Sequence, residues 1–279
     1  MSERDIAHEA ARREEWTNRA RMYADYALPK NRPFARRLVE LLEIRPGERV
    51  LDVAAGPGPV AIEAARATGP GGTVLATDIS PVWEAFIAEE AAAAGVGNVR
   101  FATMPGEALD LDDASFDVVA CQFGLMFMKN AGSALAEFRR VLRPGGRLGV
   151  AVWSTPDNVG HFKAMRALQA SLPPDLTGAG GPNPLSMGAP GLIEGLVAQA
   201  GFDEVALHPF TASHIVHDPD LEWNRLTQEG TFAQRLAGLD DAGREQSRNA
   251  VLAAFESMKN GGIISVSSEA LIVIARAPR

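Results

Sequence analysis

Residues 50–58 read VLDVAAGPG, and this stretch decides the fold of the 279-residue chain. Its apolar letters predict a short buried strand that ends on Asp52, and its small residues predict a turn into a helix over 59–68. Small residues let a ligand approach the backbone closely, and the helix N-terminus beyond presents free N–H groups and a positive dipole end. The stretch therefore predicts a strand–turn–helix unit at which a carboxylate or phosphate could dock.

The chain after this turn alternates between predicted strands and helices. Apolar runs this continuous, separated by helices, indicate parallel strands covered on both faces. Right-handed crossovers then give an open, doubly wound sheet, so the predicted fold class is α/β and Rossmann-like. We expect strands at 49–55, 73–79, 98–104, 116–123, 147–154, 203–210 and 267–277, helices over 59–68, 81–94, 131–142 and 190–200, and a turn at 143–146 (RPGG).

Helical segments are predicted before the sheet and between its later strands. Residues 4–28 and 33–43 predict two helices, with Pro29 and Pro33 as breaks. The Pro- and Gly-rich stretch 173–190 is typical of a lid or binding loop. We expect one domain over 1–279 with an N-terminal helical cap, a core and two substrate lid insertions. These parts are 1–45 for the cap, 46–153, 190–210 and 263–279 for the core, and 154–189 and 211–262 for the insertions.

The composition favours a protein that acts on small molecules in the cytoplasm. A net charge of −8 argues against a nucleic-acid partner, because binding to a phosphate backbone needs a basic stripe. The single cysteine, Cys121, excludes a disulfide framework and any metal site with several thiolates. The N-terminus is charged, and no apolar run approaches the roughly 20 residues of a membrane span. The composition leaves open whether the chain forms a homo-oligomer.

An acidic residue ends the strand that follows the glycine turn. Asp78 comes some 20 residues after the turn, where an acid can hydrogen-bond both ribose hydroxyls of an adenosine. The turn lacks the GxGxxG spacing of a dinucleotide site, and no Walker lysine follows it. The pattern therefore suits an adenosine whose other end carries a carboxylate and a cation rather than a diphosphate.

The span from about Arg49 to Ser154 resembles class I S-adenosylmethionine-dependent methyltransferases. It is particularly similar to the ubiquinone/menaquinone-biosynthesis C-methyltransferases and their small-molecule relatives. The matching segments are VLDVAAGPG, ATDISP, GEALDLDDASFDVV, CQFGLMFM with AEFRRVLRPGG, and LGVAVWS. The resemblance implies S-adenosylmethionine as cofactor and a seven-stranded sheet whose last strand is antiparallel.

The resemblance also implies roles for individual residues. The backbone at 54–56 would approach the methionine moiety while Asp52 holds the turn. Asp78 would bind the ribose, Ile79 would pack on the adenine, and residues 105–107 would lie at the adenine edge. Gln122 would face the methionine end or the reaction cavity. The expected cofactor-binding residues are Asp52, Ala54, Ala55, Gly56, Gly58, Asp78, Ile79, Pro105, Gly106, Glu107 and Gln122.

Two residues depart from the family pattern. Relatives commonly have an Asp before the position of Gly106, where it accepts from the adenine amino group. Pro105 offers neither a side-chain acceptor nor an N–H, so the adenine contact must fall to backbone atoms at Gly106 or Glu107, or be weaker. Trp83 is bulkier than the usual Met or Ala, and it packs either against the cofactor or in the core.

Methyl transfer from a sulfonium is an in-line displacement, so the protein mainly holds nucleophile and methyl close, aligned and dry. A general base is needed only if the acceptor must lose a proton. His161 is the best-placed base candidate, and Tyr23 could line the pocket. The pair His214 and His217 stands next to Asp218, but no third ligand follows at a recognisable spacing, so no metal is expected.

The main hypothesis is S-adenosylmethionine-dependent methyl transfer to a small, hydrophobic or aromatic metabolite. An alternative keeps the cofactor in a structural role, while the enzyme catalyses a non-methyl reaction such as a cyclisation. A third hypothesis is a binding module that has lost the cofactor, for which Pro105 is the only hint.

Overall fold

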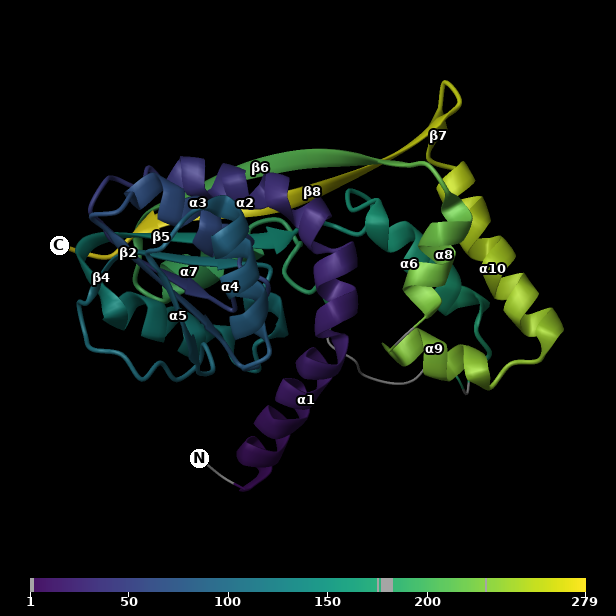
Figure 1. Ribbon diagram of the computed structural model, residues 1–279, viewed down its shortest axis with the longest axis horizontal. Helices are drawn as coiled ribbons and strands as arrows, with labels where there is room; N and C mark the ends of the chain where they lie inside the picture. Colours follow the sequence, from purple (N-terminus) through teal and green to yellow (C-terminus); the bar gives the residue numbers. More distant parts are fainter. Residues whose placement is uncertain (1–2, 175, 177–182, 229) are drawn as a thin grey trace. The chain divides into compact units, whose positions relative to one another are not determined.

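The computed structural model describes residues 3–174, 176, 183–228 and 230–279 (Figure 1). The described chain divides into two compact units. Unit 1 comprises Met1–Trp153, Pro184–Phe210 and Ala270–Arg279, and unit 2 comprises Ser154–Asn183 and Thr211–Glu269. The sequence-based division into one domain with two insertions stays a prediction.

Within the described residues the chain forms an eight-stranded sheet in the order β3-β2-β1-β4-β5-β8-β6, with the short β7 paired to β8. The first five strands pair in parallel, and β8 is antiparallel to β5. The prediction of a mostly parallel, doubly wound sheet with an antiparallel last strand is therefore confirmed. The strands are β1 Arg49–Val53, β2 Thr73–Asp78, β3 Val99–Thr103, β4 Phe116–Gln122, β5 Leu142–Trp153, β6 Asp203–Val216, β7 Lys259–Asn260 and β8 Ile263–Arg276.

Helices cover both faces of the sheet in unit 1. Helix α2 packs on α3 and on β5, α3 packs on β1 and β2, and α5 packs on β5 and on α7. The strand order reverses between β1 and β4, and ligands of open α/β sheets bind outside the carboxyl ends of the strands at such a switch point. The helices of unit 1 are α1 Glu3–Tyr26, α2 Leu28–Leu42, α3 Pro59–Thr68, α4 Trp83–Ala94, the short 3-10 helix η1 Leu125–Phe127, α5 Ala131–Val141 and α7 Leu192–Gln199.

The break between the two N-terminal helices falls at Ala27, two residues before Pro29, whereas Pro33 breaks no helix, so only the prediction for Pro33 is wrong. Pro29 lies in the first turn of α2, where an N–H would have no helical partner. Pro33 lies inside α2 and removes one hydrogen bond, but Phe34 and Leu38 of the same helix are buried. Burial of such side chains stabilises α2 by about 1.5–3 kcal/mol each, which is enough to offset the roughly 3 kcal/mol cost of an interior proline.

The RPGG segment at 143–146 is not a separate turn before the fifth strand, as the sequence suggested. It lies within β5, where Phe116 pairs with Leu142 but Val118 pairs with Arg147. The extra residues on β5 form an irregular bulge, and Gly145 supplies a backbone φ of 74°. A glycine turn and a glycine bulge share the same local sequence pattern, so only strand pairing distinguishes them.

Unit 2 has an apolar core of its own. Its helices are α6 His161–Ser171, α8 Pro219–Thr227, α9 Gly230–Ala237 and α10 Asp241–Glu256. The core includes Leu168, Val251 and Phe255, which are almost fully buried. Most of the two predicted lid insertions lies in this unit. Of the predicted lid loop 173–190, residues 175 and 177–182 lie outside the described residues. Among the helices described, none is long and apolar enough to cross a membrane.

Candidate active site

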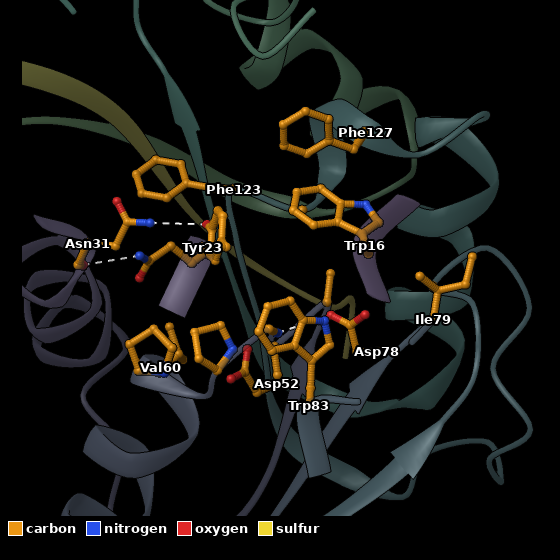
Figure 2. Close-up of a pocket in the computed structure, with 18 of the residues that line it drawn as sticks. Trp16, Tyr23, Asn31, Asp52, Val60, Asp78, Ile79, Trp83, Phe123 and Phe127 are labelled. Atoms are coloured by element: carbon orange, nitrogen blue, oxygen red, sulfur yellow. Dashed lines mark hydrogen bonds between the residues drawn. The ribbon is translucent and has the colours of Figure 1, made fainter. Parts of the chain in front are cut away.

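A pocket in unit 1 lies at the carboxyl ends of β1, β2 and β4, where the strand order reverses (Figure 2). It encloses about 800 Å³, counting space that opens to solvent. Its walls come from the turn after β1, the ends of β2 and β4, and helices α1 and α2.

The turn after β1 has a strained backbone. Ala54, Gly56 and Gly58 all have positive φ, at 55°, 53° and 86°. The left-handed conformation costs a residue with a side chain roughly 1–2 kcal/mol, so Ala54 carries strain at the pocket wall. At Gly58, an added Cβ would lie 2.8 Å from Cγ1 of Ile87, so only glycine fits. The sequence VLDVAAGPG therefore forms a turn that brings bare backbone to the pocket.

Asp78 links the end of β2 to this turn. Its carboxylate accepts hydrogen bonds from the backbone N–H groups of Gly56 at 3.0 Å and Ser80 at 3.1 Å. Burial raises the pKa of Asp78 to about 6, although the backbone hydrogen bonds from Ser80, Gly56 and Ile79 oppose the rise. Each carboxylate oxygen has more than one acceptor position, so these bonds leave Asp78 able to accept from a ligand hydroxyl as well.

Two buried oxygen atoms at the pocket accept no hydrogen bond from any described residue. They are Oδ2 of Asp52 and Oε1 of Gln122. Asp52 is 1% exposed, and burial raises its pKa to about 8, with the Asp78 carboxylate adding to the rise and a backbone hydrogen bond from Ala61 opposing it. Unsatisfied buried acceptors are costly and rare. The two oxygens of Asp52 and Gln122 therefore favour a ligand group that carries several N–H donors and a positive charge.

Aromatic rings form the wall of the pocket opposite these carboxylates. Trp16 of α1 packs edge-on against Tyr23 and Phe127, with ring centroids 5.6 Å and 5.4 Å away. Tyr23 also packs edge-on against Trp83 at 6.0 Å. Figure 2 shows Trp16 and Tyr23 on one side, with Asp52, Asp78 and Trp83 on the other. Trp83 is 1% exposed and also lines the pocket. It therefore packs in the core and borders the pocket at the same time, although the sequence offered these as alternatives.

Polar contacts attach α1 beside the pocket. The guanidinium of Arg12 pairs with Glu107 at 3.0 Å, and the hydroxyl groups of Thr17 and Ser80 lie 2.7 Å apart. The same Glu107 oxygen accepts from the backbone N–H of Lys129 at 2.8 Å. Because Glu107 is held in this way, its carboxylate serves the attachment of α1.

Eight of the eleven residues expected to bind the cofactor line this pocket. They are Asp52, Ala54, Ala55, Gly56, Asp78, Ile79, Gly106 and Gln122. Gly58, Pro105 and Glu107 are outside the lining set, although Gly58 shapes the turn. At Gly106 an added Cβ would lie 2.6 Å from Cε of Met128, so a larger residue there would require the Met128 side chain to move. Their roles as cofactor contacts stay predictions.

The two candidates for catalysis lie in different units. Tyr23 lines the pocket, and its hydroxyl oxygen accepts from Nδ2 of Asn31 at 3.1 Å. Burial raises the pKa of Tyr23 to about 12, so the phenol stays protonated near neutral pH. His161 belongs to unit 2, where its Nδ1 lies 2.9 Å from Oγ of Ser268. A catalytic role for either residue stays a prediction.

The structure gives a helix-capping role to Asp218, the acid next to His217 of the histidine pair. Asp218 is the N-cap of α8, and its side chain accepts from the backbone N–H groups of Asp220 and Leu221. Across the part of the chain that the structure describes, no three His, Cys, Asp or Glu side chains gather as metal ligands would.

Several pocket residues were not predicted from the sequence. Arg12 and Trp16 on α1, and Leu28 and Asn31 on α2, line the pocket. Trp16 and Tyr23 are seven residues apart and so share one helix face, a spacing that indicated an apolar face but not what it covers. Asn31 lies between two prolines, and nothing local to it indicated that it would be buried.

Comparisons with known proteins agree with this geometry. The methyltransferase domain family matches residues 50–146. Nocamycin O-methyltransferase from Saccharothrix syringae is 33% identical over 184 residues, 62% of this chain and 66% of the relative. Ubiquinone/menaquinone biosynthesis C-methyltransferase UbiE from Stutzerimonas stutzeri is 39% identical over 145 residues, 52% of this chain and 57% of the relative. The chain thus matches between about half and two thirds of the length of these relatives.

A solved structure shares the fold. The YcgJ protein from Bacillus subtilis superposes with a TM-score of 0.58 at 19% identity, covering 88% of this chain and 99% of that chain. At this identity the likeness concerns the fold alone, and it agrees with the Rossmann-like sheet described above.

Proposed function

Because the chain belongs to the class I S-adenosylmethionine-dependent methyltransferases, we propose that it transfers the methyl group of S-adenosylmethionine to a small, hydrophobic or aromatic metabolite. One observation carries the proposal. The strained turn after β1, the acid that ends β2 and two unsatisfied buried acceptors all meet in one pocket.

The residues of this pocket fit the cofactor of the family. The left-handed turn from Ala54 to Gly58 allows close approach, and Asp78 on the next strand suits the ribose hydroxyls. The orphaned oxygens of Asp52 and Gln122 suit the donors of an α-ammonium group. When bound, S-adenosylmethionine supplies a methyl group already activated by a sulfonium.

The part of the pocket that would hold the adenine offers apolar packing rather than side-chain hydrogen bonds. Ile79, Met104 and Gly106 line that part of the pocket, whereas Glu107 is engaged by Arg12 and by the backbone of Lys129. This supports the expectation that, with Pro105 in place of an acid, the adenine contact falls to backbone atoms at Gly106 or Glu107, or is weaker, and apolar packing adds to it.

The remaining walls suit a flat, apolar acceptor. Phe123 and Phe127 follow β4, and Trp16 faces Phe127 from α1. Phe123 is fixed in place by a ring stack on Trp153 at 3.8 Å. Rigid aromatic walls exclude water and hold an acceptor in line with the methyl group, which is most of what this displacement requires. Tyr23, protonated at neutral pH, suits donating a hydrogen bond rather than removing a proton.

Calorimetry and a product assay test the proposal. The wild-type protein should bind S-adenosylmethionine saturably, and Asp78→Ala should weaken binding by about tenfold or more, because it removes the ribose partner and the Gly56 bond together. Absence of binding to the wild-type protein would sink the proposal. With an acceptor from a panel of aromatic metabolites, release of S-adenosylhomocysteine identifies methyl transfer. Turnover without that release would instead favour the cyclisation alternative.

A further inference from the structure

Asn31 is a buried polar residue that the proposed reaction does not use. It lies on α2 between two prolines, lines the pocket and is only 7% exposed. Its backbone carbonyl accepts from Nε2 of Gln122 at 3.2 Å, and its side-chain Nδ2 donates to the hydroxyl oxygen of Tyr23 at 3.1 Å. Figure 2 shows both bonds as dashed lines. One residue of α2 therefore touches polar groups from β4 and α1.

These two bonds set which atoms the neighbours can offer to a ligand. A backbone carbonyl can only accept, so Gln122 must present its NH₂ group to Asn31, and its Oε1 is left as a buried acceptor without a described partner. The Tyr23 oxygen accepts from Asn31, so its own O–H proton is free to be donated elsewhere. With Oδ2 of Asp52, the pocket thus presents two acceptors and one donor.

This set of groups matches an α-amino acid. An ammonium brings three N–H donors to Gln122 and Asp52, and a carboxylate accepts from the Tyr23 hydroxyl. We propose that Asn31 is a positioning residue whose side-chain amide orients Tyr23 and whose backbone carbonyl orients Gln122, so that both hold the amino-acid end of the cofactor. The proposal rests on the proposed function, since it concerns the same ligand.

Two ligands separate this role from a general contribution to folding. S-Adenosylhomocysteine carries the amino acid, whereas 5′-methylthioadenosine lacks it. Calorimetry on the 279-residue chain should show that Asn31→Leu weakens the binding of S-adenosylhomocysteine about three- to tenfold, the range for losing one hydrogen bond. Binding of 5′-methylthioadenosine should change less than about twofold, because the adenosine contacts are untouched.

A neighbouring substitution provides the matched control. Arg32→Gln removes the Arg32–Glu90 ion pair from the next position of α2 without touching the pocket. It should leave both affinities unchanged. Gln122→Met removes the acceptor itself and should reproduce the selective loss. Thermal unfolding of each variant checks that the fold is retained, and Gln122→Met and Tyr23→Phe carry the test if Asn31→Leu does not fold.

A double-mutant cycle tests whether Asn31 acts through Tyr23. Tyr23→Phe should weaken S-adenosylhomocysteine selectively, and Asn31→Leu should add no further loss in that background. Equal losses for both ligands, no loss for either, or additive losses in the cycle would overturn the positioning role while leaving the proposed function intact. A wild-type protein that binds neither ligand would instead remove the proposed function.

Discussion

At the scale of single residues, two buried carboxylates determine how the pocket responds to charge. Burial raises the pKa of Asp52 to about 8 and that of Asp78 to about 6. The negative charge of Asp78 contributes to the raised pKa of Asp52. Burial raises the pKa of the Cys121 thiol to about 12, and the Asp52 carboxylate adds to the rise, so the thiol stays neutral. Arg12 partly offsets the effect at Asp78. Without a cationic ligand Asp52 is mostly protonated at neutral pH, and an ammonium bound beside it would lower its pKa and favour the carboxylate, which accepts hydrogen bonds.

The raised pKa of Asp52 predicts a pH-dependent stability. An acid whose pKa is higher in the folded than in the unfolded state binds more protons when folded, so the free energy of unfolding falls as pH rises from about 4 to about 8. Asp52→Asn cannot ionise and should flatten this decline. Thermal unfolding midpoints of both proteins between pH 5 and pH 9 measure the effect, and parallel curves would contradict it.

At the scale of elements, helix α1 is the part of the site that is hardest to predict from the sequence, and it is the part that we expect to move most easily. Arg12 and Thr17 attach it beside the pocket, and Trp16 and Tyr23 form the wall. Ion pairs that are partly exposed contribute only about 0–1 kcal/mol each, so these contacts hold α1 weakly compared with a buried core. Movement of α1 is therefore the expected route for ligand exchange.

Weakening the attachment of α1 should speed ligand release. The variant Arg12→Gln with Thr17→Val should raise the dissociation rate of S-adenosylhomocysteine about three- to tenfold, since each lost contact is of order 1 kcal/mol. Stopped-flow tryptophan fluorescence can follow release through Trp16 and Trp83. Arg21→Gln removes an exposed pair with Asp25 on the same helix and serves as the control. An unchanged dissociation rate in the double variant would show that α1 does not limit release.

At the scale of the whole molecule, the two units carry separate cores, and every residue that lines the described pocket belongs to unit 1. Leu168→Ala in the core of unit 2 should cost about 2–5 kcal/mol of local stability, because it leaves a cavity at a fully buried site. Denaturant unfolding measures that loss. The affinity for S-adenosylhomocysteine should change less than about twofold, and a larger change would show that the units are energetically coupled.

Much of the fold could be predicted because its signals are local. Helix α3 was predicted with its bounds, and β1 and β4 to within two residues, since continuous apolar runs and small-residue turns determine where strands and helices alternate. The errors have a common cause. Pro33 inside α2 and the bulge of β5 at Gly145 depend on packing and strand pairing, which a local pattern does not contain.

The amino-acid sequence by itself determined the doubly wound sheet, the glycine turn and the acid that ends β2, because each depends on the order and spacing of nearby residues. Only the tertiary structure decided that Trp16 and Asn31 reach the same pocket, because they lie on helices whose placement depends on long-range packing. It also decided that Asp52 and Gln122 are left with unsatisfied oxygens, since burial and hydrogen-bond partners exist only once distant segments have met.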